Sequence, residues 1–246
     1  MRAPVDTIFA PAFPRAMGWI NVATLRMDQQ RGRPVLVEFF DVCRVHSLRT
    51  LPYLRAWHER YADDGLRVVS VHAPGYPPSF EDEVVRAAVE RLGIEHPVAL
   101  DHDFNLWQDY GNEGWPARYL FTPQQRLLEF HYGQGGYDET ERAIQELLGI
   151  EGDVVAPLRP QDAPGAELVP PTADVAGPWS GPYEAGAVWA VLEGPGTVTV
   201  NGDRIEIGFT GVHRLIEHDR HTEAVLELEL GPGVVCHGVQ FEAGLA

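Results

Sequence analysis

The chain of 246 residues has two cysteines, Cys43 and Cys236, and no lysine, because all 19 of its basic residues are arginines. Two cysteines are too few for the disulfide framework of a secreted protein and are typical of a reducing compartment. No apolar run approaches the ~20 residues that a helix needs to cross a bilayer. The N-terminal stretch 1–17 interrupts its apolar positions with proline, aspartate and arginine, unlike a signal peptide. The sequence therefore predicts a cytoplasmic protein without a membrane partner.

Positive charge is scarce as well. The formal net charge is −17, and residues 151–246 carry 15 acidic residues against four arginines. Such a surface repels the phosphate backbone of nucleic acids and anionic lipids. The charge balance thus predicts no nucleic-acid partner, and no motif in the chain requires a cofactor.

The first 150 residues alternate between the periodicities of strands and helices. Apolar, β-branched runs predict strands, and apolar residues at steps of three or four predict helices. The expected strands are 34–40, 66–73, 96–100, 117–121 and 126–132, and the expected helices are 48–61, 80–92, 104–110 and 138–148. Strand, helix and strand in succession indicate a parallel βαβ unit, and the last two strands form a hairpin. Residues 1–150 are therefore predicted to form an α/β domain with a central mixed sheet flanked by helices.

The composition changes after residue 150. Residues 151–183 are rich in proline, glycine and alanine without periodicity, which is typical of an extended linker. Residues 184–246 consist of short alternating runs, and Asn201-Gly202 between two of them is a strong signal for a tight hairpin turn. We expect this last segment to form a small all-β domain, a sandwich or a jelly roll.

The motifs of the first domain resemble those of a known family. "VLVEFF" is followed by a helix in "LRTLPYLRAWHERYADDGLRVVSVHAPGY", then by "GIEHPVALDHDFNLWQDYGNEGWPARYLF" and "HYGQGGYDETERAIQELL". Over about residues 10–150 this is similar to thioredoxin-like proteins, or redoxins, of the bacterial TlpA and DipZ type. The resemblance implies a thioredoxin-like fold. In the DipZ group a β-sandwich similar to carbohydrate-binding modules follows, which implies the same architecture for the second half.

The resemblance also fixes a register around the family's Cys-X-X-Cys motif. That motif lies at the start of the first long helix, six positions after an acidic residue and five positions before a proline. Here the acid is Glu38 and the proline is Pro52, so the two cysteine positions hold Arg44 and Ser47, and the motif is "RVHS". A dithiol oxidoreductase needs one thiol to attack and a second to resolve the mixed disulfide. The sequence therefore predicts a degenerate redox site and a binding or scaffold function.

A single-cysteine enzyme is the alternative. Cys43 lies one position before the motif, next to Arg44 and near His46, and both neighbours favour a thiolate. Cys43 could then act as the catalytic residue of a thiol oxidoreductase or of a peroxidase of the thiol-specific antioxidant type. The competing interpretation is an inert, partly buried thiol. Cys236 alternates with valines and is expected to be a small buried residue.

The same resemblance implies a ligand groove. Trp115-Pro116 matches the family's cis-proline, which presents a backbone edge to an extended substrate. We expect an extended peptide, a protein segment or a small ligand beside Arg44, His46, Ser47, Trp115 and Pro116. Glu38 matches the family's buried proton relay, and here it is expected to pair with Arg44 or His46.

Three further patterns have simpler explanations. The histidines of "HDRH" (218–221), with His213 and His237, lack the spacing of zinc ligands, and no metal is expected. "GQGGYDE" (133–139) lacks the lysine and hydroxyl residue of a phosphate loop and is expected to be a structural turn. Trp179, Tyr183 and Trp189 suit either a core or a sugar-stacking platform. The all-β domain could accordingly bind carbohydrate or protein, or join two copies of the chain.

Overall fold

The computed structural model describes residues 1–3 and 7–246. The stretch that we compare with a signal peptide thus falls partly outside the described residues. The chain divides into two compact units. Unit 1 comprises Met1–Asp41, His46–Pro74 and Val89–Ala156, and unit 2 comprises Val42–Val45, Gly75–Ala88 and Pro157–Ala246.

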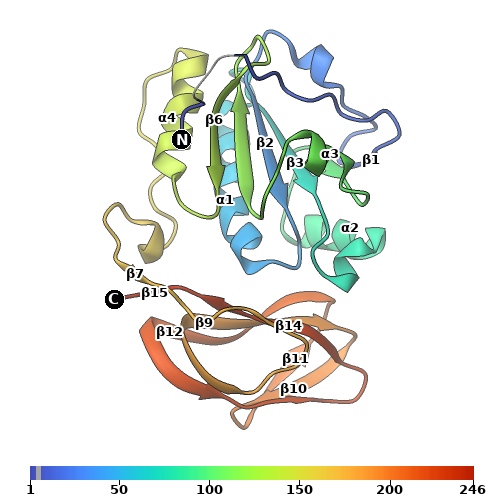
Figure 1. Ribbon diagram of the computed structural model, residues 1–246, viewed down its shortest axis with the longest axis vertical. Coiled ribbons are helices and arrows are strands. Elements are labelled where there is room, and N and C mark those ends of the chain that lie inside the picture. The colour runs from blue at the N-terminus through green and yellow to red at the C-terminus, as the bar shows by residue number, and fades with distance from the viewer. Residues whose placement is uncertain (4–6) are drawn as a thin grey trace. The chain divides into compact units, whose positions relative to one another are not determined.

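Unit 1 is built on a six-stranded mixed sheet (Figure 1). The strand order is β1-β4-β3-β2-β5-β6, in which β2, β3 and β4 are parallel and β1, β5 and β6 are antiparallel to their neighbours. The strands are β1 (Gly18–Ile20), β2 (Val35–Phe40), β3 (Arg67–His72), β4 (Val98–Leu100), β5 (Ala117–Phe121) and β6 (Leu127–Tyr132). The parallel strands are buried, which is why their sequences are almost uninterrupted apolar runs.

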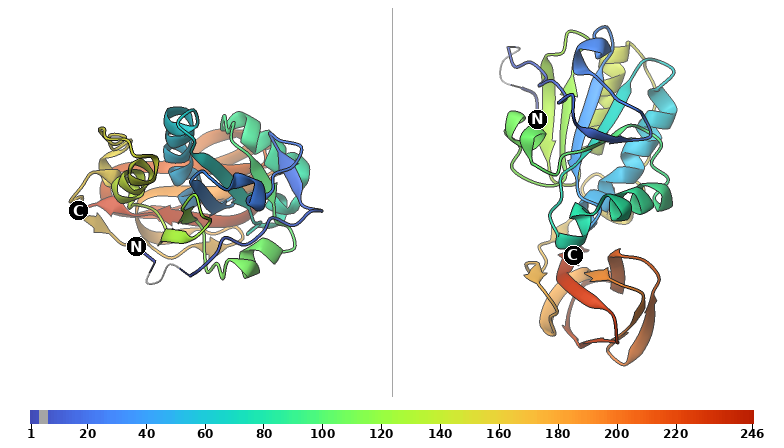
Figure 2. Two further views of the ribbon diagram at one scale, coloured as in Figure 1. Left: turned by 90° about the horizontal axis from the view of Figure 1, so that it is seen from above. Right: turned by 90° about the vertical axis from the view of Figure 1, so that its right-hand side faces the viewer.

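The α-helices are α1 (Val45–Tyr61), α2 (Asp82–Arg91), α3 (Asn105–Asp109) and α4 (Tyr137–Leu148), and 3-10 helices span Met27–Gln30, Pro77–Phe80 and Pro160–Asp162. Side chains alternate between the faces of a strand. Val35, Val37 and Phe39 of β2 accordingly pack in one core with the N-terminal segment and α3, whereas Leu36 packs with α1 and α4. Figure 2 shows α1 and α3 on opposite sides of the sheet.

Two details of the N-terminal half of the chain depart from the sequence analysis. Strand β1 is not among the expected strands, and it pairs only with β4 at the edge of the sheet. The helix predicted for 80–92 starts at Asp82. Before it, the Ser79 hydroxyl donates to the carbonyl of Tyr76 and accepts from the Tyr76 N–H, which closes the 3-10 turn.

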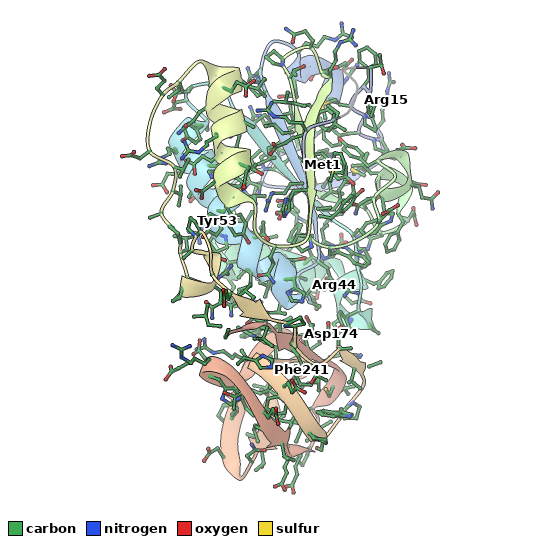
Figure 3. The ribbon with its side chains drawn as sticks, turned by 60° about the vertical axis from the view of Figure 1, so that its left-hand side comes forward. Met1, Arg15, Arg44, Tyr53, Asp174 and Phe241 are labelled. Atoms are coloured by element: carbon green, nitrogen blue, oxygen red, sulfur yellow. The ribbon has the colours of Figure 1, made fainter. Side chains whose placement is uncertain are left out.

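The C-terminal region is all-β. Its strands are β7 (Leu168–Val169), β8 (Val175–Ala176), β9 (Gly181–Glu193), β10 (Gly196–Val200), β11 (Asp203–Ile207), β12 (Gly211–Leu226), β13 (Leu228–Leu230), β14 (Val235–Glu242) and β15 (Gly244–Leu245). They form antiparallel sheets in the orders β12-β9-β14-β8, β11-β10-β13 and β15-β7. The four-stranded and three-stranded sheets share one core, which includes Phe241 (Figure 3).

The expected hairpin forms at Asn201-Gly202. Val200 pairs with Asp203, so Asn201 and Gly202 alone make the turn, and they have positive φ angles of 50° and 90°. Strands β7 and β8 lie in the segment predicted to be a linker. The predicted fold class, an α/β domain followed by an all-β domain, is confirmed. No helix among the described residues is long and apolar enough to span a membrane.

Candidate functional site

The positions that the resemblance aligns with the motif, 44 and 47, lie at the start of α1, and Figure 3 labels Arg44 there. Arg44 directly precedes the helix, and His46 and Ser47 belong to its first turn. Arg44 and His46 are half-buried, and Ser47 is buried. A sulfur atom at either motif position would therefore be at the helix N-terminus, but arginine and serine supply none.

Neither Cys43 nor Cys236 is part of a disulfide, and both are buried. Cys43 is 0% exposed. Burial raises the pKa of Cys236, whose sulfur lies 3.6 Å from the carbonyl oxygen of Gly238. A buried thiol is shielded from peroxide and from protein disulfides. The geometry therefore favours the inert interpretation of Cys43.

Ser47 has a structural contact. Its Oγ atom accepts a hydrogen bond of 3.2 Å from the backbone N–H of Asp41, which directly follows β2. The Asp41 carboxylate in turn lies 3.5 Å from Nε2 of the buried His72. The hydroxyl thus ties the end of the strand to the first turn of the helix.

Within unit 2, the backbone before α1 is bound by a buried glutamine. Oε1 of Gln240 accepts a hydrogen bond of 2.8 Å from the N–H of Val45, and its Nε2 donates one of 2.7 Å to the carbonyl of Cys43. The first N–H groups of a helix are the ones that stabilise an anion at its end. Here the N–H of Val45 already donates to Gln240. The guanidinium of Arg44 lies 5.2 Å from the centre of the Tyr76 ring.

Glu38 lies in β2, in the centre of the sheet. It is 0% exposed, and neither carboxyl oxygen has a hydrogen-bond partner among the described residues. Burial raises the pKa of Glu38 to about 8, against the opposing effect of the Arg118 guanidinium. The cation that acts on this carboxyl is thus Arg118, its direct partner in the β2–β5 register, rather than the expected Arg44 or His46.

Arg118 is itself buried, and burial lowers its pKa. Its Nη2 donates to the carbonyl of Gly135 at 2.6 Å, and its guanidinium carbon lies 5.0 Å from the centre of the Tyr137 ring. The sequence analysis missed this residue, although one signal for it exists. An arginine inside the apolar strand "ARYLF" stands opposite the only acid of the neighbouring central strand.

The loop 133–136, which we call the glycine loop, connects three parts of the site. The N–H of Gly133 donates to the carbonyl of Pro116, Gly135 accepts from Arg118, and the Gln134 amide donates to Nδ1 of His46. Gly133, Gly135 and Gly136 have φ angles of 80°, 84° and 60°, which glycine adopts without strain. The loop is therefore hydrogen-bonded both to His46 and to Pro116, whereas Arg44, His46 and Ser47 do not line the pocket beside Pro116.

A pocket of about 290 Å³ lies beside Pro116, and it is lined by Glu113, Gly114, Trp115, Pro116, Tyr132 and Gly133. The Trp115–Pro116 peptide bond is cis. The Trp115 indole N–H donates to the carbonyl of Ala73 at 2.9 Å, and its ring lies 4.4 Å from that of Trp107. The aromatic wall of the pocket is thus held in place by its own hydrogen bond and packing.

The remaining candidates have local partners. Among the described residues, no three histidine, cysteine, aspartate or glutamate side chains are placed to hold a metal ion. His213, His218, His221 and His237 each contact a residue of their own region, namely Phe209, Tyr183, Glu184 and Glu193. Tyr183 is buried in the all-β core and Trp179 packs against that core, whereas Trp189 is half-buried and donates its indole N–H to Glu242.

Solved structures share the fold of unit 1. A DsbE-like thiol:disulfide interchange protein from Chlorobium tepidum superposes with a TM-score of 0.52 at 20% identity, over 57% of this chain and 96% of that protein. A thioredoxin-like superfamily protein gives a TM-score of 0.52 at 21% identity, over 60% of this chain and 100% of that protein. The fold is therefore thioredoxin-like.

The chain also has sequence relatives among known proteins. The chain is 30% identical to the protein DipZ of Mycobacterium bovis over 164 residues, which cover 65% of this chain and 24% of DipZ. It is 33% identical to NHL repeat-containing protein 2 of Bos taurus, over 52% of this chain and 18% of that protein. It is 24% identical to the thiol-disulfide oxidoreductase YkuV of Bacillus subtilis, over 56% of this chain and 93% of YkuV. The chain thus spans a quarter or less of the first two relatives. No family model matches it.

Proposed function

We propose that the thioredoxin-like domain is a binding module that has lost the dithiol chemistry of its relatives. The observation that carries the proposal is the burial of Cys43, which leaves no exposed thiol among the described residues. The register supports it, because Arg44 and Ser47 stand where a Cys-X-X-Cys motif would place its two sulfurs. The N–H of Val45, at the helix start, is also already bound by Oε1 of Gln240.

The binding site of this proposal is the pocket beside Pro116. It is formed by a loop and by the end of β6, and the glycine loop joins it to His46. Its volume of about 290 Å³ is small for a drug-sized ligand and suits one side chain of an extended peptide or protein segment. The proposed partner is therefore a polypeptide that lies along the loop 113–116.

For the C-terminal region we propose a β-sandwich similar to carbohydrate-binding modules. Support comes from the four-stranded and three-stranded sheets, which enclose one common core. Because Tyr183 belongs to that core, the proposal concerns the architecture of the region and names no sugar ligand.

The register can be tested with introduced cysteines. In a Cys43→Ala background we expect Arg44→Cys/Ser47→Cys to form an intramolecular disulfide under mild oxidation, because these positions would then recreate the motif. Mass spectrometry detects it as the loss of two hydrogens. The matched control is His46→Cys with Cys43 retained, which spaces the two cysteines equally but one position earlier. We expect no disulfide there, because that pair lies one position outside the proposed register.

The loss of redox chemistry is tested on the unmodified protein. We expect the folded chain to show no thiol that reacts with Ellman's reagent and the urea-unfolded chain to show both, and we expect no sulfenic acid at Cys43 after peroxide treatment. In the His46→Cys control, a disulfide between Cys43 and the introduced thiol would overturn the register. Rapid reaction of native Cys43 that is lost in Arg44→Ala would support the single-cysteine enzyme instead.

A further inference from the structure

The pocket beside Pro116 is lined by an acidic residue and aromatic residues, without a basic one. Its lining includes one charged residue, the acid Glu113, and two aromatic residues, Trp115 and Tyr132. No arginine or histidine lines it, and Glu113 is exposed, with no ion pair among the described residues. The pocket thus presents a negative charge and aromatic surfaces to a ligand.

The hydrogen bonds around the pocket determine how Tyr132 is presented. The Tyr119 hydroxyl donates its proton to Oδ1 of Asn112 at 2.8 Å. The two tyrosine hydroxyls lie 3.0 Å apart, and because Tyr119 has no second proton, Tyr132 must be the donor between them. The Tyr132 oxygen therefore keeps its lone pairs as acceptors, and its only proton is already used. Burial raises the pKa of Tyr119, which keeps this chain of donors protonated.

We infer that the pocket beside Pro116 binds an arginine side chain of an extended partner segment, through the Glu113 carboxylate, the Tyr132 oxygen and the aromatic faces of Trp115 and Tyr132. This inference rests on the proposed function and names its ligand class. A guanidinium carries five N–H donors and no acceptor, so it complements a pocket that offers acceptors. It is also planar and stacks on aromatic faces. A lysine meets the charge requirement but lacks the planar fork, and an acidic side chain is repelled.

The test uses the full chain and four acetylated, amidated heptapeptides, Ala-Thr-Val-X-Val-Thr-Ala, with arginine, lysine, glutamine or glutamate at X. Binding is followed by NMR shifts of the Gly114 and Gly133 amides and of the Trp115 indole. At low salt we expect the arginine peptide to bind about tenfold more tightly than the glutamine peptide, with lysine between them and glutamate weakest. The preference for arginine should fall when salt is raised, because Glu113 is exposed.

Variants separate the charge from the rest of the pocket. Glu113→Gln should bring the arginine peptide close to the glutamine peptide and leave the glutamine peptide unchanged. The control Glu90→Gln removes an exposed acid of α2 that does not line the pocket, and it should leave the preference intact. If all four peptides shift the pocket resonances with equal affinity, the inference is wrong and the proposed binding function stands. If none of them shifts these resonances, both are wrong.

Discussion

At the scale of single residues, Glu38 and Arg118 are the least expected feature of the domain. Both are buried, and they face each other across β2 and β5. Burying an ionised carboxyl without hydrogen bonds costs free energy, and a protein avoids part of that cost by keeping the proton. The raised pKa of about 8 means that Glu38 is mainly neutral at pH 7. Arg118 then has the Tyr137 ring and the Gly135 carbonyl as its main partners.

This pKa predicts a specific pH dependence of stability. The folded protein holds the Glu38 proton up to about pH 8, whereas the unfolded chain releases it near the ordinary value of 4.5. The raised pKa of Glu38 therefore does not lower the free energy of unfolding below about pH 4.5. Between pH 4.5 and 8 the free energy of unfolding falls as the pH rises, because the unfolded chain can release this proton and the folded protein keeps it. We expect Glu38→Gln to match the wild type in urea unfolding at pH 5 and to exceed its free energy of unfolding by about 1–3 kcal/mol at pH 8. Glu90→Gln serves as the exposed control, and a constant difference between Glu38→Gln and wild type from pH 5 to pH 8 would refute the raised pKa.

The residues of the site could be predicted only in part. The family resemblance rests on motifs along the chain, and it implies Arg44, His46, Ser47, Trp115 and Pro116. Tyr132, Glu113 and Arg118 join the site through strand pairing and loop packing, which spacing along the chain does not encode. The burial of Cys43 likewise depends on tertiary packing rather than on its basic neighbours.

At the scale of elements, the glycine loop positions much of the site. A Cβ atom at Gly136 would lie 2.6 Å from the ring of His131, and the backbone there has a φ of +60°. His131 in turn lies 3.0 Å from the carbonyl of Gln134, so the ring cannot move without disturbing the loop. The short run between β6 and α4 is thus constrained by both its backbone and a neighbouring side chain.

A matched pair of substitutions separates these two constraints. Gly111 has a φ of +57°, and a Cβ atom there would meet nothing within 4 Å, so Gly111→Ala should cost only the left-handed backbone, about 1 kcal/mol. Gly136→Ala adds the steric conflict and should cost about 2–4 kcal/mol. Urea unfolding measures both, and the NMR signals of His46 should shift only in Gly136→Ala. An equal loss in the free energy of unfolding for the two variants would show that the His131 ring moves aside without an energetic cost.

Most elements of the fold can be predicted from the sequence, because hydrophobic periodicity reflects burial directly. Strands β2 and β3 and the hairpin at Asn201-Gly202 follow the pattern closely. Strand β1 has only three residues, too few to show a period. Strands β7 and β8 have two residues each in a proline-rich segment, and they form because β15 and β14 offer them partners from the far end of the chain.

At the scale of the whole molecule, the order of residues in the chain and their grouping in space differ. Val42–Val45 and Gly75–Ala88 come from the N-terminal half of the sequence, yet they form one compact unit with the C-terminal region. Gln240 is the most specific contact within that unit, because its single carboxamide pairs with both a carbonyl and an N–H of the 42–45 segment. A division of the sequence at a linker could not anticipate this grouping.

The contribution of Gln240 can be measured at a single amide. Gln240→Ala leaves the Cys43 carbonyl and the Val45 N–H without their partner, and we expect a loss of about 1–3 kcal/mol in urea unfolding. We also expect faster hydrogen exchange at the Val45 amide. Gln29→Ala removes an exposed glutamine and should change neither quantity. Unchanged protection of Val45 in Gln240→Ala would show that another group satisfies this amide.

The burial of both thiols has a consequence for the surroundings in which the domain can operate. Glutathione exchange and disulfide exchange with other proteins both begin at an accessible sulfur, and the described surface offers none. Partner binding at the pocket beside Pro116 would therefore be indifferent to the ambient reduction potential. Under the proposed function, the binding site would keep the same structure while the redox state around it changes.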